Sequence, residues 1–285
     1  MSIRKSIVSG ENSFYPSDCD SLTKLIENCF LSEIGPGRLP GEYSPNLESI
    51  KGLIVPHAGF IYSGHEAAHS YLKLYETKLP ETLIIIGPNH RGIGEEVSVY
   101  TGIGWETPFG TVETDLELTN KILENNLFKS DNSSHLYEHS IEMQLPFIKY
   151  IYDKASLTPK IVTISVIDQS FDTSKRIGSI LGELLKNNEN IVFIASSDFS
   201  HYVPINFAKK YDIIAIEEII KFEFKEFYNK INEYGLSICG SGPIVSVAIA
   251  SQICGSKKSK LLKYATSGDI INSKEVVGYG AILFN

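Results

Sequence analysis

Three histidines stand directly after apolar stretches of the sequence, at points where a buried strand would end. His57 lies in VPHAG, His90 in GPNHRG and His201 in SSDFSHY. Imidazole is the commonest metal-binding side chain of proteins, and it also exchanges protons near neutral pH. A single histidine in such a turn is more often only hydrogen-bonded to its surroundings. These three histidines can therefore form a functional site only if the fold brings them together.

Two further side chains could join them as catalytic groups. Asp198 stands three residues before His201, and a carboxylate beside an imidazole can orient its tautomer or act as a general base. The alternative is that Asp198 caps the helix expected after Pro204. His139, in EHSIEMQLPF, precedes a helix expected from Ser140 and could project from its start toward the same place.

Cys239 differs from the other cysteines because of its neighbours. It lies in ICGSGPIV, where Pro243 suits the first turn of an apolar helix. A helix N-terminus favours a thiolate, so Cys239 is a candidate nucleophile or soft metal ligand, or else a buried thiol in a tight turn. The chain has no CxxC spacing, and we expect Cys19, Cys29 and Cys254 to be small buried hydrophobic residues.

The segment HEAAH (65–69) offers a rival site. Two histidines four residues apart on a helix can chelate zinc, with the glutamate between them as the base of a metalloprotease. No third-ligand motif follows His69, and the segment begins just after a glycine-rich strand end rather than inside a long helix. We therefore interpret His65 as a structural residue.

The elements that must position these residues alternate along the chain. Continuous isoleucine and valine runs are typical of strands that are covered on both faces, in a largely parallel sheet flanked by helices. The expected strands are Gly52–Val55, Thr82–Ile86, Lys160–Val166, Asn190–Ala195, Leu261–Ala265 and Val276–Phe284. The expected helices are Asp20–Leu31, His65–Tyr75, Asp115–Asn125, Ser140–Tyr152, Thr173–Asn187, Ile205–Phe222, Phe224–Asn232 and Gly242–Ile253.

These patterns predict a single α/β domain over residues 1–285. No linker rich in proline, glycine or serine divides the chain, and Val97–Asp115 alternates weakly as an antiparallel hairpin would. In open α/β sheets, ligands bind in the crevice beyond the carboxyl ends of the strands. His57, His90 and His201 all follow such ends, so we expect them to converge on one crevice.

Composition narrows the classes of function. The chain has 285 residues, 42% of them hydrophobic, and a formal net charge of −8. A negative chain is a poor partner for nucleic acid, whose phosphates must be neutralised by lysine and arginine. No apolar run approaches the roughly 20 residues that cross a bilayer, and the N-terminus lacks a signal-peptide core. These features are typical of a soluble, cytoplasmic protein that binds neither nucleic acid nor membrane.

Taken together, the motifs resemble those of the Memo family, also called the AmmeMemoRadiSam system protein B family. The matching segments span nearly the whole chain in order: FYP (14–16), PHAGFIYSG (56–64), GPNH (87–90), EHSIEMQLPF (138–147), SSDFSHY (196–202), CGSGPI (239–244) and TSGD (266–269). That family is similar in fold to the class III extradiol dioxygenases, which bind non-haem Fe(II) through two histidines and a carboxylate. The resemblance therefore implies an extradiol-dioxygenase-like fold.

The resemblance also implies a set of site residues. His57 and His90 match the two histidine ligands, and Cys239 takes the place of the carboxylate. Asp198 and His201 would line the same pocket, with His139 nearby. A thiolate softens such a site toward Cu(I), zinc or thiolate-ligated iron, which argues against ring-cleaving dioxygenation. The expected cofactor is a transition metal, iron or copper before zinc, and no nucleotide cofactor is expected.

Two hypotheses of function follow. The first is a metal-dependent redox enzyme that holds its metal on His57, His90 and Cys239, with Asp198 or His201 handling protons. The second is a binding module that keeps the crevice, has no turnover, and recognises a small molecule or a peptide. By resemblance, radical-SAM and AMMECR-type proteins are candidate partners.

Overall fold

The fold is built on one long mixed sheet. In this computed structural model, residues 2–10, 13–46 and 48–285 are described. The strands follow the order β1-β5-β6-β8-β3-β9-β2-β13-β11, and β4 joins β8 and β7 at the side of an 11-stranded sheet. The bounds are β1 (Ile3–Arg4), β2 (Gly52–Val55), β3 (Thr82–Pro88), β4 (Val97–Val99), β5 (Gly104–Thr107), β6 (Gly110–Thr114), β7 (Lys129–Ser130), β8 (Lys160–Val166), β9 (Ile191–Ser196), β11 (Ser259–Thr266) and β13 (Gly278–Phe284).

The centre of the sheet is parallel, as the sequence predicts. β2 pairs with β9, β9 with β3, and β3 with β8, all in parallel register. β13 and β11 add an antiparallel edge beside β2. A separate pair, β10 (Val203–Pro204) and β12 (Glu275–Val276), lies apart from the main sheet. The carboxyl ends of β3, β9 and β2 are consequently neighbours at one edge.

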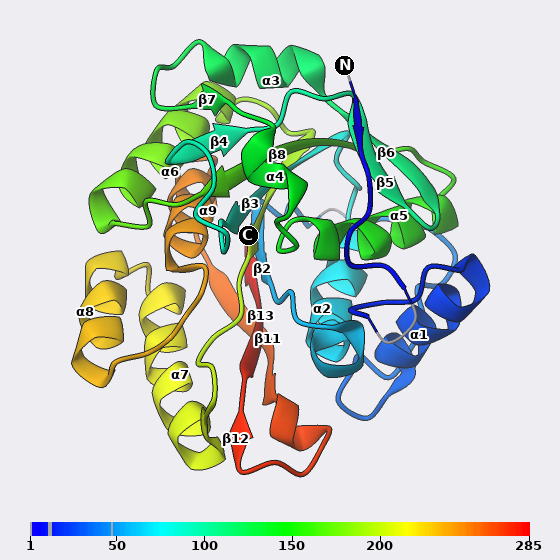
Figure 1. The fold of residues 1–285 in the computed structure, drawn as a ribbon, viewed down its shortest axis with the longest axis vertical. Helices are drawn as coiled ribbons and strands as arrows, with labels where there is room; N and C mark the ends of the chain where they lie inside the picture. The colour runs from blue at the N-terminus through cyan, green and yellow to red at the C-terminus, as the bar shows by residue number, and fades with distance from the viewer. Residues whose placement is uncertain (1, 11–12, 47) are drawn as a thin grey trace.

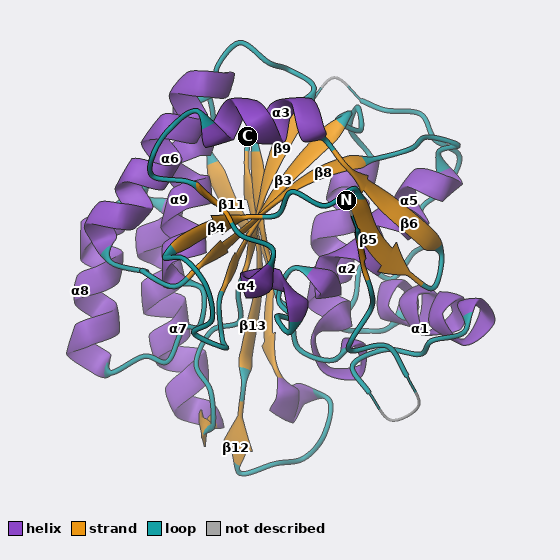
Figure 2. Ribbon diagram, turned by 45° about the horizontal axis from the view of Figure 1, so that its top comes forward, coloured by secondary structure: helices purple, strands orange, loops and turns teal. Residues whose placement is uncertain are grey.

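Helices cover both faces of the sheet, so the molecule has three layers (Figures 1 and 2). One side carries α1 (Cys19–Leu31), α2 (Phe60–Tyr75) and α5 (Leu145–Lys154). The other side carries α6 (Phe171–Leu185), α7 (Ile205–Ile220), α8 (Phe224–Tyr234) and α9 (Ser241–Ile253). The shorter helical elements are α3 (Leu116–Leu123), α4 (Ser133–Leu136), and the 3-10 turns η1 (Glu142–Gln144) and η2 (Ser267–Asp269).

Two hydrophobic cores lie between these layers. Alternate residues of a strand point to opposite faces of the sheet. In β2, Leu53 and Val55 belong to the core under α1, α2 and α5, whereas Ile54 belongs to the core under α6 and α9. All three side chains are fully buried. The continuous apolar runs are thus explained by burial on both faces, and the single α/β domain predicted from them is confirmed.

Several boundaries differ from the sequence prediction. Helix α2 begins at Phe60, five residues before the expected His65, because Gly64 is a packing residue and not part of a turn. A Cβ on Gly64 would lie 2.5 Å from the Sγ of Cys29 in α1, so glycine permits the close approach of the two helices. The expected helix from Ser140 begins instead as η1 and continues as α5.

The hairpin expected over Val97–Asp115 is shorter than predicted. Strands β5 and β6 form it, whereas β4 pairs antiparallel with β8 and is a separate strand. The expectation of a buried Cys19 is also wrong: Cys19 is exposed at the start of α1, and its thiol donates to the carbonyl of Pro108. Cys29 is buried and Cys254 is partly exposed. Across the described residues, no helix combines the length and apolarity that a membrane span requires.

Candidate metal centre

The carboxyl edge of the parallel strands brings the candidate residues together. His57 lies two residues beyond β2, His90 two beyond β3, and Asp198 two beyond β9. Cys239 comes from the opposite direction, two residues before α9 begins. Because β3, β9 and β2 are adjacent in the sheet, residues far apart in the sequence face one another across a single crevice.

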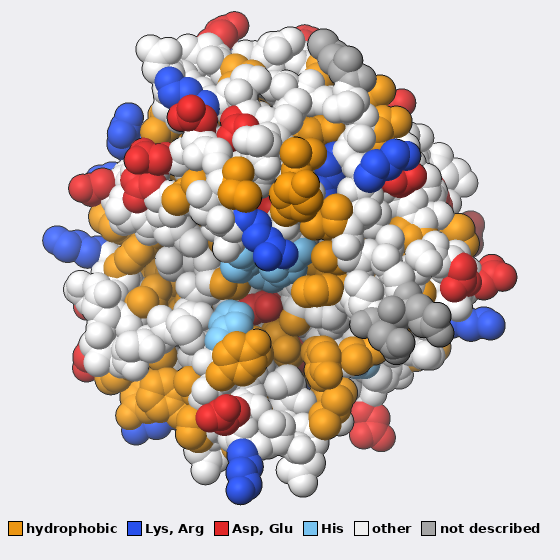
Figure 3. All heavy atoms as spheres, in the orientation of Figure 1, with side chains coloured by type: hydrophobic (Ala, Val, Ile, Leu, Met, Phe, Trp, Pro, Cys, Tyr) orange, Lys and Arg blue, Asp and Glu red, His pale blue; other side chains and the backbone are white. Residues whose placement is uncertain are grey.

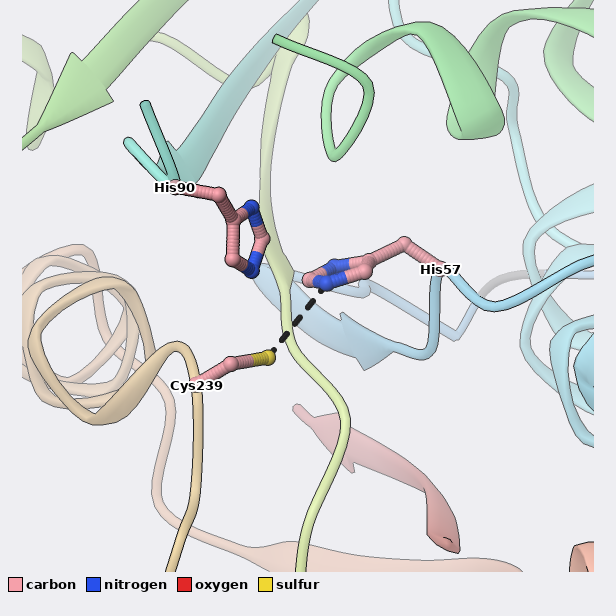
Figure 4. Close-up of side chains that lie close together, drawn as sticks. All are labelled: His57, His90 and Cys239. Atoms are coloured by element: carbon pink, nitrogen blue, oxygen red, sulfur yellow. Dashed lines mark hydrogen bonds between the residues drawn. The ribbon is translucent and has the colours of Figure 1, made fainter. Parts of the chain in front are cut away.

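His57, His90 and Cys239 form a compact cluster. The Nε2 atom of His57 lies 3.3 Å from the Sγ of Cys239, and the rings of His57 and His90 are 5.2 Å apart between centroids. One donor atom from each of the three residues lies within 4.8 Å of the other two. Figure 4 shows the three side chains pointing toward a common point from three different segments.

The hydrogen bonds of His57 fix which of its nitrogens is free. Its Nδ1 lies 2.9 Å from the Oγ of Ser196, whose hydroxyl donates to the carbonyl of Ser140 at 2.7 Å. The side-chain amide of Gln144 also donates to this Oγ, at 2.8 Å. Because the hydroxyl proton is committed to a carbonyl, the Oγ must accept from His57. Nδ1 therefore carries the proton, and Nε2 presents a lone pair to the cluster.

Glu138 does the same for His90. Its Oε1 accepts from the Nδ1 of His90 at 2.9 Å, and its Oε2 accepts from the backbone N–H of the same residue at 2.6 Å. Oε1 also accepts from the backbone of His139 and Ser140. Burial acts to raise the pKa of Glu138, but the His90 hydrogen bond and nearby histidines hold it at about 2. The carboxylate is ionised and both of its oxygens accept hydrogen bonds, so it orients the His90 ring through the Nδ1 atom.

A second group of donor atoms consists of His90, Glu138 and His139. Since four backbone and side-chain N–H groups already occupy the two oxygens of Glu138, this carboxylate is better placed to orient ligands than to be one. The His57, His90 and Cys239 group has its free donor atoms directed at one another. We therefore take it as the candidate centre.

The surroundings of Cys239 modify the sequence prediction. Burial, and next the nearby carboxylate of Asp198, raise the pKa of the Cys239 thiol above its usual range. These effects outweigh the helix N-terminus and the backbone N–H of Asp198, which donates to Sγ at 3.2 Å. Without a metal the side chain is a protonated thiol, which argues against a free nucleophile. A bound metal ion would deprotonate it outright.

The donor set fits a transition metal. Two imidazoles whose Nδ1 atoms are engaged in hydrogen bonds, together with one thiol, match the preference of soft and borderline ions for nitrogen and sulfur. Burial, followed by the charges of the neighbouring histidines, lowers the pKa of His57 well below its usual value, so its ring is neutral as a ligand must be. His57, His90 and Cys239 would hold the ion, and the cavity beside them leaves room for further ligands.

The cluster lies beside a cavity of about 560 Å³. Figure 3 shows histidine side chains in a hollow of the molecular face, bordered by hydrophobic atoms and by a basic side chain. The cavity lining combines the candidate residues with aromatic and small side chains: Phe14, His57, Ala58, Gly59, Tyr62, His90, His139, Asp198, His201, Tyr202, Ser267, Ile271, Ser273, Val277 and Tyr279. This volume is within the range of small-molecule sites.

The three residues predicted to be catalytic, Asp198, His201 and His139, all line this cavity. Asp198 is 3% exposed, its carboxylate accepts from the backbone N–H of His57 at 2.8 Å, and burial raises its pKa to about 6. The carboxylate of Asp198 therefore binds the backbone of His57 and does not cap helix α7. The ring of His139 lies 4.8 Å from that of His90, and burial lowers its pKa to about 4. His201 donates from Nδ1 to the carbonyl of Ser237 at 2.8 Å, which leaves its Nε2 free.

Sequence reasoning missed the tyrosines of the cavity. Tyr279, on β13, is 2% exposed, and burial, then the charges of Asp198 and Glu66, raise the pKa of its phenol, so its hydroxyl remains a proton donor. Tyr62, on α2, lines the cavity nearby. Tyr62 and Phe14 lie inside the segments PHAGFIYSG and FYP, so the resemblance pointed to their neighbourhoods. Nothing in the local sequence of Tyr279 distinguishes it from other strand residues.

Removing the partner of His57 is expected to weaken metal binding. Ser196→Ala deletes the atom that holds the Nδ1 proton, and loss of such a partner typically costs about 10- to 100-fold in metal affinity. Competition titration of the purified variant with a chelator measures the change. The control is Ser251→Ala, which removes a buried hydroxyl on α9 that has no hydrogen-bond partner among the described residues. Equal affinity of the two variants would contradict the role given to Ser196.

The HEAAH segment lies on α2 and serves the packing of α1 against α2. The Nδ1 of His65 lies 2.7 Å from the Oγ of Ser32, and the Nε2 of His69 lies 2.9 Å from the carbonyl of Ile34. Glu66 between them is 1% exposed, and neither carboxylate oxygen has a partner among the described residues. The two histidines are therefore engaged in structural hydrogen bonds and not in a zinc site, and Glu66 is buried between them.

Glu66 is expected to make stability depend on pH. Burial raises its pKa to about 8 from a usual 4.5, so folding favours the protonated form. Its stabilising contribution is full below about pH 4.5 and is lost as the pH rises toward 8. Glu66→Gln should remove this slope, at about 1.4 kcal/mol for each unit of pKa shift. Urea unfolding of the parent and the variant between pH 5 and 9 measures how the free energy of unfolding depends on pH. The control is Glu117→Gln, which changes an exposed glutamate. Parallel pH curves for Glu66→Gln and the parent would contradict the role given to Glu66.

Comparison with known proteins places the chain in a family. The family model described as "Memo-like protein" matches residues 4–283. A MEMO1 family protein of Methanococcus vannielii is 42% identical over 285 residues and covers 99% of both chains. MEMO1 family proteins of Methanopyrus kandleri and Nitrosopumilus maritimus are 38% and 39% identical, again over almost the full length of both chains.

A solved structure supports the fold. The crystal structure of an uncharacterised protein of Escherichia coli K12 superimposes with a TM-score of 0.53, covering 83% of this chain and all of that one. Its sequence identity is 12%, so this likeness concerns the fold alone. The sequence matches extend over nearly every residue that forms the sheet, the crevice and the histidine–cysteine cluster. On this basis, the chain belongs to the Memo family.

Proposed function

We propose that the crevice holds a transition metal on His57, His90 and Cys239. The observation that carries this proposal is the convergence of one ring nitrogen from each histidine and one sulfur within 4.8 Å of one another, beside an open cavity. Ser196 and Glu138 support it, because each holds the Nδ1 proton of one histidine and so commits the other nitrogen. Iron and copper suit this donor set, and zinc is a third candidate.

The chemistry proposed for the site is redox chemistry on a small substrate. A bound iron or copper ion supplies one-electron and oxygen-linked chemistry at positions that face the cavity. Asp198 and His201 line that cavity and would move protons, with His139 next to His90. A thiol in place of a carboxylate disfavours ring-cleaving dioxygenation, so we propose another oxygen-linked reaction.

Metal analysis tests this proposal first. Protein purified without added metal is expected to contain close to one equivalent of iron, copper or zinc, because three donor atoms are already arranged for it. His57→Ala and His90→Ala variants should lose that content while their circular dichroism stays unchanged. If both variants retain the metal content of the parent, the assignment of ligands is wrong.

A binding module without turnover is the second candidate function. The size of the cavity favours it, because 560 Å³ accommodates a small molecule or the side chains of a peptide irrespective of any reaction. Oxygen uptake by the metal-loaded protein with catechols, ascorbate and thiols separates the two candidates. Uptake that is lost in His57→Ala favours the enzyme, and silence across all three substrate classes favours the binding module.

A further inference from the structure

Tyr202 adopts a backbone conformation that is unfavourable for its side chain. Its φ angle is 54°, in the left-handed region that glycine occupies at little cost and bulky residues rarely adopt. Both neighbours hold it there. The backbone N–H of His201 donates to the Oγ of Ser237 at 2.7 Å, and Val203 pairs with Val276 in the β10–β12 sheet. The turn is therefore fixed by its flanks.

Nothing in the packing of Tyr202 offsets this cost. Phe222 has a similar φ of 61°, but its ring is partly buried in the core and lies 5.9 Å from that of Phe284. Ser156, the remaining non-glycine residue with positive φ in the described chain, is small. Tyr202, in contrast, is 75% exposed. Its aromatic ring gains little burial, and glycine would adopt the same backbone conformation at lower cost. Strained residues of this kind gather at ligand-binding sites.

The position of Tyr202 shows what its ring can contact. It lines the metal-centre cavity, and its ring centroid lies 6.2 Å from that of His201. Ile271, another exposed apolar side chain at 49%, lines the same cavity, and Val277 does so from the end of the β12 segment. No lysine or arginine within the described ranges lines it. The cavity thus has the histidine–cysteine cluster on one side and an uncharged wall that includes Tyr202 and Ile271 on another.

We propose that Tyr202 is a specificity-determining residue whose ring packs on a flat, uncharged part of the bound ligand. The ligand would carry a nitrogen, oxygen or sulfur donor that reaches the His57, His90 and Cys239 cluster, and an apolar body that lies along Tyr202 and Ile271. This inference rests on the proposed metal centre for the donor end of the ligand. The contact with the ring of Tyr202 does not depend on the metal, so the two can fail separately.

A pair of probes isolates the contribution of the ring. Imidazole and 4-phenylimidazole share the donor group and differ by one phenyl ring, and their binding to the Co(II)-loaded protein is followed by visible absorption. The parent should bind 4-phenylimidazole the more tightly. Tyr202→Ala should lower that preference about fivefold, as expected for loss of an aromatic contact, and Tyr202→Phe should keep it. An unchanged preference in Tyr202→Ala overturns the proposal.

Two further measurements keep the result interpretable. If the parent binds no cobalt, the proposed metal centre is wrong. Saturation-transfer NMR of 4-phenylimidazole with metal-free protein then decides on Tyr202, since transfer to the phenyl protons should fall in Tyr202→Ala and stay in Tyr137→Ala, an exposed tyrosine outside the cavity. Equal transfer in both variants overturns the proposal. Tyr202→Ala should also melt within about 1 °C of the parent; a fall of several degrees would assign the ring a structural role instead.

Discussion

Replacing His57 with alanine is expected to weaken transition-metal binding by more than about 100-fold. Loss of a residue that merely orients a metal ligand costs up to about that factor, and loss of the ligand itself must cost more. His57 is 2% exposed and its Nε2 lies 3.3 Å from the Sγ of Cys239, so the variant loses a donor atom that is already in place beside the thiol. Chelator competition with zinc or cobalt measures the affinity.

The matched control is His65→Ala. His65 lies eight residues away on the adjoining helix, and its ring is hydrogen-bonded to Ser32 and not to the cluster. Its removal should leave the affinity unchanged. His57→Gln, which fills more of the buried volume, separates metal loss from a packing defect. Parent-like affinity in both His57 variants would contradict the proposed centre.

Replacing Glu142 with glutamine is expected to destabilise the fold by about 3–5 kcal/mol, the usual result of removing one partner of a buried ion pair. Glu142 is fully buried and pairs with the guanidinium of Arg4, which is 3% exposed. The guanidinium also lies 4.5 Å from the centre of the Trp105 ring. The uncompensated charge of Arg4 would then remain in the interior, which is the physical origin of the loss.

Glu142 also anchors the N-terminal segment that reaches the cavity. It accepts from the Oγ of Ser6 at 2.6 Å, from two backbone N–H groups, and from the hydroxyl of Tyr15 at 2.8 Å. Phe14, next to Tyr15, lines the cavity and lies 5.0 Å from the His139 ring. The destabilised variant should therefore lose the order of one cavity wall as well.

Urea unfolding at pH 7 measures the free energy of unfolding. The control is Glu106→Gln, which breaks the exposed pair between Lys5 and Glu106 and should cost less than about 1 kcal/mol. Combining Arg4→Met with Glu142→Gln should recover part of the loss, because no unpaired charge stays buried. A loss below about 1 kcal/mol in Glu142→Gln alone would contradict the buried-pair interpretation.

The central strands were predictable because a single physical signal defines them. Residues Gly52–Val55 and Lys160–Val166 match β2 and β8 at both ends, since burial on both faces demands a continuous apolar run. The position of His57 and His90 beyond strand ends follows from the same signal. With a parallel sheet, the edge at which those ends meet is set by topology, so the crevice could be expected from the sequence.

The residues that tune the cluster were not predictable in this way. Ser196, Gln144 and Glu138 act through hydrogen bonds to residues 48 to 139 positions away, and no local pattern records such distances. The pairing of Arg4 with Glu142 spans 138 positions. The sequence left open whether the helix N-terminus activates the thiol of Cys239 or the thiol is simply buried. Burial is a tertiary property, and it is the largest cause of the raised pKa of this thiol.

The strained turn at Tyr202 was hidden for a related reason. Its left-handed backbone depends on the anchoring of His201 by Ser237 and on the pairing of β10 with β12, two strands of only two residues each. Such short strands carry no periodic signal. A glycine at this position would have indicated a left-handed turn, whereas a tyrosine gives no such indication.

X-ray absorption spectroscopy of the zinc-loaded protein tests the central claim most directly. The claim requires one sulfur neighbour at about 2.3 Å and at least two nitrogen neighbours with imidazole scattering at about 2.0–2.1 Å. Cys239→Ser should lose the sulfur neighbour and keep the imidazole pattern. A parent spectrum with only nitrogen and oxygen neighbours, or a sulfur neighbour that persists in Cys239→Ser, would contradict the proposed centre of His57, His90 and Cys239.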